Sequence, residues 1–316
     1  MTCTAWQFTG VNEPLVRNEV ETPRPGANQV VLDIKAAGLC HTDVGVLTDE
    51  GWLSTLGYTP ITMGHEVAGV ISEVGENVTE WKVGDRVGVC PTTEIGAPGF
   101  LYDGGFGEQV TLDQVALVKI PDNVSFAQGA AGTDAGMTSH SAVITNGQVK
   151  AGDKVCIIGM GGLGQIGARV AVLAGAEVYI VDTNDAVVDL AKRLGAKDVK
   201  KSIKDYADIG FDCVVDFAGF DTTNAAIEAV RFGGRVVQVG MGKLEATIST
   251  KALILSNVTL IGSVGGTKDD VAGVYHYFST GELEAAITEI TFDEIPEGLD
   301  RLHKGGVVGR LVAVRD

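Results

Sequence analysis

The stretch "VCIIGMGGLGQIGARVAVLAGAEVYIVD" constrains the fold of this chain more than any other. A β-type run comes first, a glycine turn and a helical pattern follow, and a second β-type run ends in Asp182. Gly159, Gly161 and Gly164 form a G-x-G-x-x-G pattern, which allows a tight turn, a close approach of backbone to a pyrophosphate and close packing of helix on strand. The unpaired N–H groups of the helix N-terminus then face the phosphates. The stretch therefore predicts a dinucleotide-binding βαβ unit rather than a chance group of turn glycines.

The pattern of predicted secondary structure changes near residue 149. Before about residue 130, short β-type runs are broken by glycine and proline, which indicates a compact, largely antiparallel β domain. From 149 onward strands alternate with helical patterns, which indicates a parallel sheet. The tail from about Lys268 leaves this rhythm, and we expect it to return to the first domain. We therefore predict an α/β protein, with a Rossmann-type doubly wound parallel sheet over residues 134–267 and a mainly antiparallel β domain made of residues 1–133 and 268–316.

The second strand of the βαβ unit also predicts which cofactor is used. Asp182 can accept hydrogen bonds from both ribose hydroxyls of the adenosine, whereas a 2′-phosphate would meet its negative charge. The following residues, Thr183 to Asp185, offer no arginine for such a phosphate. We therefore predict NAD rather than NADP. The cofactor is expected to be lined by further residues of the glycine turn and of later strand ends, namely Gly162, Leu163, Ala218, Val239 and Ser263.

Composition narrows the classes of partner. Lys and Arg number 24 against 41 Asp and Glu, a formal charge of −17, so nucleic acid and anionic membranes would meet mostly repulsion. The start "MTCTAWQFTG" has no basic stretch followed by an apolar one, and no apolar run reaches the length of a membrane span. The five cysteines are scattered and contain no C-x-x-C pair, which argues against a disulfide framework. We expect a soluble protein of the cytoplasm, without a nucleic-acid or membrane partner.

One carboxylate stands in an unusual place. In "QGAAGTDAGMTSH" the run of small residues looks buried, yet it carries Asp134. A buried carboxylate is costly without a positive partner. No Lys or Arg lies within ten residues on its N-terminal side. The partner must come from elsewhere in the chain or be a metal ion.

Two further stretches carry residues suited to zinc. "AAGLCHTDV" places Cys40 after a strand, and "TMGHEVAGV" places His65 and Glu66 at the start of another. Thiolate and imidazole suit zinc, and a catalytic zinc takes three protein ligands and keeps one position open. Asp134 would complete such a set. Taken singly, Cys40 is typical of a small buried hydrophobe and His65 of a hydrogen-bonded core histidine, and spacing alone leaves these alternatives open.

The motifs taken together point to a known family. "GLCHTDV", "GHEVAGVISEVGENVTEWKVGDRV", "TDAGMTSH" and "GMGGLG", in this order, resemble the zinc-dependent medium-chain alcohol dehydrogenases over essentially the whole chain. The resemblance implies a GroES-like β catalytic domain beside the Rossmann domain, and a homodimer or homotetramer. In bacterial secondary alcohol dehydrogenases and related carbonyl reductases, the aspartate of "TDAG" is a zinc ligand. The resemblance therefore implies one catalytic zinc on Cys40, His65 and Asp134, with Glu66 either beside these ligands or a fourth ligand.

The same resemblance implies roles for other residues. Thr42 takes up the proton of the alcohol, Thr138 packs at the nicotinamide, and His41 contacts the cofactor pyrophosphate. Asp43 orients the zinc-bound histidine, with a turn-capping aspartate as the alternative. Arg310 reaches the pyrophosphate, with a surface arginine as the alternative. The implied substrate is an alcohol, in this subgroup a secondary one, or the matching ketone or aldehyde.

Two departures from the family pattern affect these expectations. Many relatives have a lobe with four cysteines that binds a structural zinc, whereas "CPTTEIGAPGFLY" contains Cys90 alone, so we expect no structural zinc. The histidine that completes the proton path in the family is replaced by Gly45, so solvent is expected to finish that path. Trp52, Leu53 and Leu56 are expected either to line the substrate pocket or to form the core of a small helix.

Three alternative functions stay open on the sequence. A polyol dehydrogenase is the first alternative, although the Asp134 type of site favours secondary alcohols and ketones over polyols or primary alcohols. A zinc-free quinone or enoyl reductase shares the two domains, but Cys40, His65 and Asp134 together speak against it. A non-catalytic nucleotide-binding protein is kept open by Gly45, since fold alone does not give function. Activity with simple alcohols separates the last two from a zinc alcohol dehydrogenase.

Overall fold

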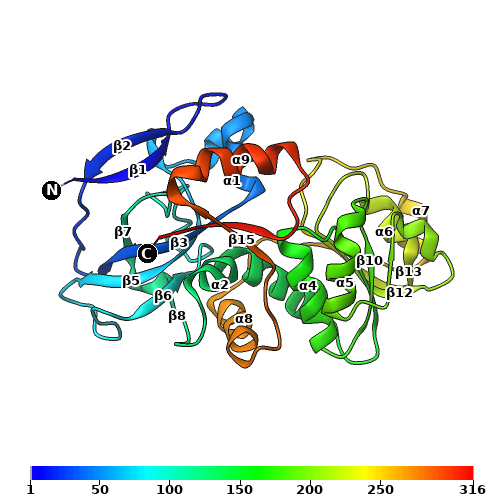
Figure 1. Cartoon of the computed structure of the whole chain (residues 1–316). Helices are drawn as coiled ribbons and strands as arrows, with labels where there is room; N and C mark the ends of the chain where they lie inside the picture. The colour runs from blue at the N-terminus through cyan, green and yellow to red at the C-terminus, as the bar shows by residue number, and fades with distance from the viewer. Residues whose placement is uncertain (1, 316) are drawn as a thin grey trace. The chain divides into compact units, whose positions relative to one another are not determined.

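The computed structural model describes residues 2–315, and the chain forms two compact units (Figure 1). Unit 1 contains the chain up to Asp134 and again from Thr267 onward, and unit 2 is Ala135–Gly266. Each unit has a sheet and a hydrophobic core of its own.

Unit 1 is built on a seven-stranded sheet. The strand order is β15-β16-β3-β5-β6-β8, with β7 also paired to β3, and every pair is antiparallel except β15 with β16. A second sheet of order β2-β1-β4 is antiparallel as well. The prediction of a mainly antiparallel β domain is confirmed. The strands are β1 (Thr2–Phe8), β2 (Val16–Glu21), β3 (Gln29–Leu39), β4 (Ile61–Thr62), β5 (Glu66–Val74), β6 (Arg86–Val89), β7 (Gln109–Asp113), β8 (Leu117–Lys119), β15 (Ile287–Thr291) and β16 (Arg310–Val314).

Helices cover and connect these sheets. The C-terminal part of the chain supplies α8 and α9 and then places β16 antiparallel to β3, so two strands from opposite ends of the sequence lie side by side (Figure 1). A capping box of Thr267 and Asp270 starts α8, and Gly281 in the left-handed conformation ends it. The helices of unit 1 are α1 (His41–Thr48), η1 (Glu50–Thr55), η2 (Gln114–Ala116), α2 (Phe126–Ala131), α8 (Lys268–Thr280), η7 (Phe292–Glu294) and α9 (Ile295–Lys304).

Unit 2 is a six-stranded parallel sheet with helices between the strands. Its order is β11-β10-β9-β12-β13-β14, so the direction of winding reverses between β9 and β12. Such a switch point is where doubly wound sheets bind ligands, and the predicted Rossmann-type sheet is confirmed. The strands are β9 (Lys154–Ile158), β10 (Glu177–Val181), β11 (Asp198–Lys200), β12 (Phe211–Asp216), β13 (Val230–Gln238) and β14 (Thr259–Gly262). The helices include α4 (Gly162–Leu173), α5 (Val188–Leu194), α6 (Thr223–Ala229) and α7 (Thr250–Leu255), with short turns η5 (Asp185–Val187) and η6 (Ile203–Tyr206).

The segment that carries Asp134 is not a regular α-helix. After α2, the π-helical turn η3 (Gly132–Gly136) is followed by α3 (Met137–His140) and a second π-helical turn, η4 (Ser141–Asn146). Gly132 is needed here because a β-carbon would stand 2.6 Å from the ring of Tyr275. The Tyr275 hydroxyl in turn donates to the Gly129 carbonyl, 2.8 Å away. Single π-helical turns within helices are frequently found at functional sites.

Two global properties follow from the described residues. Within 2–315, no helix combines the length and the apolar character that crossing a bilayer requires. All five cysteines are buried free thiols.

Candidate metal and cofactor sites

One buried carboxylate organises the turn between β3 and α1. Cys40 is the N-cap of α1, and its backbone N–H donates to Asp43 Oδ2 at 2.9 Å. The other oxygen, Asp43 Oδ1, lies 3.1 Å from His65 Nδ1. Asp43 therefore caps the helix and contacts the histidine at once, and its role in orienting a zinc-bound histidine stays a prediction. With Nδ1 engaged in this way, Nε2 of His65 is left to face the other side.

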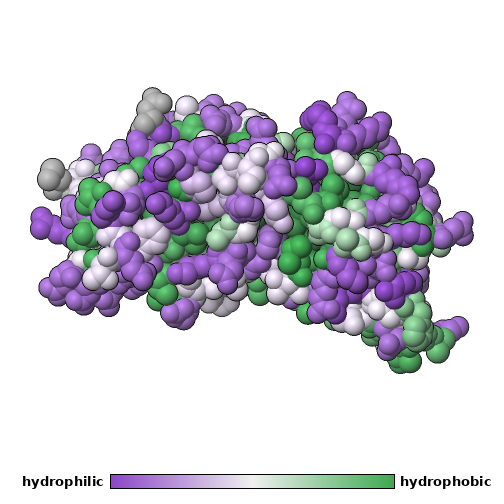
Figure 2. All heavy atoms as spheres, turned by 90° about the horizontal axis from the view of Figure 1, so that it is seen from below, coloured by the Kyte–Doolittle hydropathy of each residue, from purple (hydrophilic) through white to green (hydrophobic). Residues whose placement is uncertain are grey.

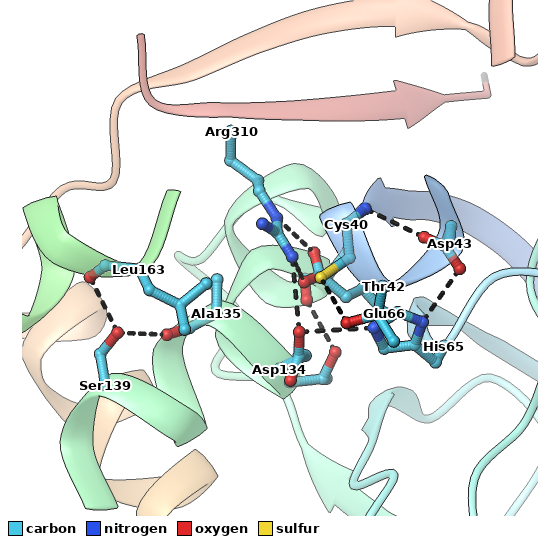
Figure 3. A network of polar contacts seen from close by, with 12 residues as sticks. Cys40, Thr42, Asp43, His65, Glu66, Asp134, Ala135, Ser139, Leu163 and Arg310 are labelled. Atoms are coloured by element: carbon cyan, nitrogen blue, oxygen red, sulfur yellow. Dashed lines mark hydrogen bonds and ion pairs between the residues drawn. The ribbon is translucent and has the colours of Figure 1, made fainter. Parts of the chain in front are cut away.

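Four side chains with metal-binding atoms converge next to this turn. The ligand atoms of Cys40, His65, Glu66 and Asp134 all lie within 4.8 Å of one another. They come from the β3–α1 turn, the start of β5 and the π-helical turn η3 (Figure 3). Four ligands around one zinc at its usual bond lengths lie roughly 3–4 Å apart. The donor types and their spacing therefore fit one zinc ion, and within residues 2–315 no second such cluster of three or more occurs.

Arg310, the first residue of β16, completes the cluster from the far end of the chain. Its Nε donates to Glu66 Oε2 at 3.0 Å, and its Nη2 donates to Glu66 Oε1 and, at 3.4 Å, to Asp134 Oδ2. Only 2% of Arg310 is exposed, so the alternative of a surface arginine is wrong. Its contact with the cofactor pyrophosphate stays a prediction.

Glu66 itself is packed against the neighbouring strand. Its carboxylate lies over Gly38 in β3, and a β-carbon at Gly38 would overlap it. Only glycine at position 38 leaves room for this carboxylate beside Arg310.

The pKa shifts within the cluster indicate that positive charge stabilises it. Burial alone lowers the pKa of His65, but the charge of Asp43 and hydrogen bonds to Asp134, Asp43 and Cys40 raise this pKa well above its ordinary value. Burial raises the pKa of Glu66 to about 7 although Arg310 opposes the change. For Asp134, burial is outweighed by the hydrogen bond and charge of His65 and by Arg310, which hold its pKa below the usual range. A divalent cation supplies the same charge, because metal ligands bind in their deprotonated forms.

The residues next to Cys40 lie on the first turn of α1. The Cys40 thiol donates to Thr42 Oγ1 at 3.4 Å, so this hydroxyl lies at the cluster (Figure 3). His41 is exposed and Thr42 is half-buried. The structure thus brings Thr42, Asp43, Glu66 and the three expected ligands together within unit 1.

The glycine turn of unit 2 has the geometry expected for a phosphate-binding loop. Gly159 follows β9 with φ 87°, a conformation that favours glycine. Gly164 packs so closely that a β-carbon there would overlap the Gly159 carbonyl oxygen, whereas a β-carbon at Gly161 would meet nothing within 4 Å. Gly161 is the N-cap of α4, which begins at Gly162. The N-terminus of α4 therefore lies at the switch point between β9 and β12.

Asp182 stands at the end of β10 and anchors this turn. Its Oδ2 accepts the backbone N–H of Met160 at 2.7 Å, and its Oδ1 accepts that of Asn184 at 2.8 Å. The carboxylate is half-buried, so it holds the glycine turn while remaining accessible from outside.

The other predicted cofactor residues lie at the ends of the later strands or on the neighbouring helix. Ala218 follows β12 and lies next to Gly159, since a β-carbon built on Gly159 would stand 3.3 Å from Ala218. The Ser263 hydroxyl, beyond β14, accepts from Asn146 Nδ2 at 2.9 Å. Ser139 of α3 donates to the Leu163 carbonyl at 2.8 Å, which ties the glycine turn to the helix carrying buried Thr138 (Figure 3). Val239 follows directly after β13.

Sequence reasoning missed the ion pair of Arg310 with Glu66. The partners are 244 residues apart, and no local pattern connects them. The one available signal was Gly38 inside a strand pattern, because glycine in a strand often marks a close approach.

Comparisons with known proteins agree with this geometry. Residues 26–122 match the family described as alcohol dehydrogenase GroES-like domain, and residues 162–280 match the zinc-binding dehydrogenase family. An alcohol dehydrogenase of Geobacillus stearothermophilus is 33% identical over 95% of this chain and 96% of its own length.

Solved structures give the same result. An acetophenone reductase from Geotrichum candidum, solved with NAD, superposes with a TM-score of 0.91 at 27% identity, covering 99% of this chain and 97% of the other. An alcohol dehydrogenase from Aeropyrum pernix gives a TM-score of 0.90 at 30% identity, covering 99% and 100%. The two domain matches, the Geobacillus relative and the Cys–His–carboxylate cluster lead to one conclusion: this chain is an enzyme and belongs to the zinc-binding, medium-chain alcohol dehydrogenases.

Proposed function

We propose that this enzyme interconverts alcohols and their ketones or aldehydes with NAD, using one zinc ion bound by Cys40, His65 and Asp134. The observation that carries the proposal is the convergence of these ligand atoms with Glu66 in a buried cluster. The family supplies the chemistry, and the NAD-bound relative is named for the reduction of a ketone. That name favours secondary alcohols as substrates, with polyols as the second candidate.

The residues of the chain have distinct tasks in this reaction. Zinc polarises the oxygen of the substrate and NAD exchanges the hydride when the two are bound. Thr42 Oγ1 lies at the cluster and takes up the proton of the alcohol. Asp43 fixes the ring of His65 through Nδ1. Arg310 balances the charge of Glu66, so this carboxylate stays beside the ligands rather than adding an uncompensated charge.

The assignment of NAD rests on Asp182. Its carboxylate is positioned at the end of β10 by two backbone N–H groups and carries the charge that disfavours a 2′-phosphate. In this proposal unit 2 holds the dinucleotide and unit 1 is the catalytic domain. Five free cysteines fit a reducing cytoplasm.

We also propose that the enzyme is a homo-oligomer in which β14 meets a second copy. β14 is one of the two edges of the unit 2 sheet, β11 being the other, and edge strands present unpaired backbone groups. Large apolar side chains are exposed on it and around it, namely Ile254, Leu255, Leu260 and Val264. Figure 2 shows apolar groups gathered at the right-hand end of the view, the side on which Figure 1 draws α7 and β13.

Metal content and activity of three variants test the zinc site. The wild-type chain is expected to hold about one zinc, measured by mass spectrometry, and to oxidise 2-butanol with NAD. Asp134→Asn should lose most of the zinc and roughly 100-fold or more of kcat/KM, because a neutral amide replaces a charged ligand. Asp134→Cys should keep the zinc but turn over more slowly, since a second thiolate leaves a weaker Lewis acid.

The control is Asp122→Asn, which removes an exposed carboxylate from the same unit. It should match the wild type in zinc and rate. Full zinc content and unchanged kinetics in Asp134→Asn would contradict the ligand assignment, and an inactive wild type would contradict the proposed function.

A further inference from the structure

Asp216, the last residue of β12, carries a carboxylate that is fully buried in unit 2. Its Oδ1 accepts the backbone N–H groups of Ala218 and Gly219, each at 2.9 Å. The Thr222 hydroxyl donates to its other oxygen, Oδ2. Within residues 2–315 these three donors, rather than a Lys, Arg or His, are its hydrogen-bond partners. Because a buried carboxylate is costly without such partners, the donors and the loop that carries them are held around it.

The backbone of the same residue holds the loop that follows β13. The Asp216 carbonyl accepts the N–H groups of Val239 and Gly240, each at 2.9 Å, and the Ala218 carbonyl accepts that of Gly242 at 3.1 Å. A β-carbon at Gly240 would stand 2.5 Å from the carbonyl carbon of Ala218, so the two loops approach more closely than a side chain allows. The loops after β12 and β13 are therefore hydrogen-bonded side by side.

A second bridge connects the end of β13 with the start of α6. Gln238 Nε2 donates to the Gly240 carbonyl at 2.8 Å, and its Oε1 accepts from Thr223 Oγ1 at 3.0 Å. Thr223 directly follows Thr222, which is bonded to the buried carboxylate. Side chains and backbone thus join both loops into one network with Asp216 at its centre.

These two loops carry residues that the sequence predicts to line the cofactor. Ala218 lies next to Gly159 of the glycine turn, and Val239 directly follows β13. Both stand beyond the carboxyl ends of parallel strands, where doubly wound sheets bind their ligands. Groups that line a ligand must be held in place by neighbours that do not touch it, since small displacements cost much of the binding.

We infer that Asp216 is a positioning residue for the dinucleotide: it holds the loops after β12 and β13 together and so keeps Ala218 and Val239 in place. This inference rests on the proposed function, in which unit 2 binds NAD. Weakening the network should raise KM for NAD and leave kcat at saturating NAD, KM for the alcohol and zinc content unchanged. A carboxylate with a structural role alone would lower Tm and the active fraction without changing KM for NAD.

The test uses Thr222→Val in the zinc-loaded enzyme, because valine keeps the shape of threonine but cannot donate to Asp216. KM for NAD should rise roughly tenfold while kcat stays within about threefold, as loss of one hydrogen bond to a charged group predicts. The dissociation constant of NADH, titrated by its fluorescence, should rise by a similar factor. Thr222→Ser restores the hydroxyl and should restore both values. Asp216→Asn should have at least the effect of Thr222→Val if it folds, and the threonine variants decide the question if it does not.

Asp221→Asn is the matched control. Asp221 lies in the same loop, is exposed and forms an ion pair with Lys243. Its φ is 58°, a conformation that asparagine also tolerates, so this variant should keep the wild-type KM for NAD.

A Thr222→Val enzyme with the wild-type KM for NAD and NADH affinity, whatever its Tm, overturns the inference. The same holds if Asp221→Asn raises KM as much as Thr222→Val does. A wild type that binds NADH but oxidises no alcohol contradicts the proposed function, while the NADH titrations still decide the role of Asp216. A wild type that does not bind NADH overturns both.

Discussion

Asp134 is a single carboxylate held by groups from distant parts of the chain. His65 Nε2 and Arg310 Nη2 each lie 3.4 Å from its Oδ2. Its sequence neighbours offer no cation, which is why the sequence alone required either a distant partner or a metal. The structure supplies the distant partner in Arg310, and in our proposal the zinc ion of the family lies at the same site.

The charge of Asp182 is expected to decide between NAD and NADP. Asp182→Asn removes the charge, and kcat/KM with NAD relative to NADP should fall by about tenfold or more. The two carboxylate oxygens of Asp182 accept the N–H groups of Met160 and Asn184, and the asparagine amide has only one oxygen to do so. The free energy of unfolding should therefore also fall by about 1 kcal/mol. Both are measured by steady-state kinetics with each cofactor and by urea unfolding.

Asp185→Asn is the control for this change, since Asp185 is exposed and pairs only with the surface residue Lys201 among the interactions described in 2–315. It should leave the cofactor ratio unaltered. A wild type that uses NADP as efficiently as NAD would show that Asp182 does not discriminate.

At the level of the element, two glycines of the turn before α4 are expected to have different roles, Gly164 in folding and Gly161 in cofactor binding. Gly164→Ala forces its β-carbon onto the Gly159 carbonyl, so it should destabilise the fold by roughly 1–3 kcal/mol and lower Tm. Gly161→Ala meets nothing within 4 Å and has φ −74°, so it should leave Tm unchanged within about 1 °C. Its methyl group instead occupies the approach to the helix N-terminus, and KM for NAD should rise about tenfold.

Calorimetry and NAD kinetics on the two purified variants check this contrast. Equal loss of Tm in both would mean that Gly161 is a structural glycine only. Normal NAD binding by Gly161→Ala would place the pyrophosphate elsewhere.

The same elements show which parts of the fold the sequence predicts. The parallel sheet and the glycine turn were predictable because the strand, turn and helix patterns are local. The π-helical turns around Asp134 were not, because they depend on packing of Gly132 against Tyr275, far along the chain. The contact between Trp52 and Gly45 was not predictable for a similar reason. The sequence indicates for Trp52 either a pocket residue or the core of a small helix, and the contact forms only because η1 folds back toward α1.

For the molecule as a whole, the C-terminal segment joins the two ends of the chain within unit 1. It enters the sheet as β16 beside β3 and carries Arg310 to Glu66. Strand β3 ends one residue before Cys40, so the same pairing that closes the sheet also sets the metal cluster. This pairing joins residues more than 250 positions apart, which is why the sequence indicated the return of the tail but not its role at the site.

The assembly of the whole enzyme is expected to depend on the edge strand β14. Light scattering after size exclusion should give at least twice the chain mass of 32.9 kDa at micromolar concentration. Leu260→Lys places a charge on the exposed edge, a device that blocks strand pairing, and should shift the protein toward the monomer. Leu244→Lys changes an exposed leucine of the same unit outside α7 and β14, so it should retain the wild-type mass. A monomeric wild type, or a Leu260→Lys variant with the wild-type mass, would rule out β14 as the contact between copies.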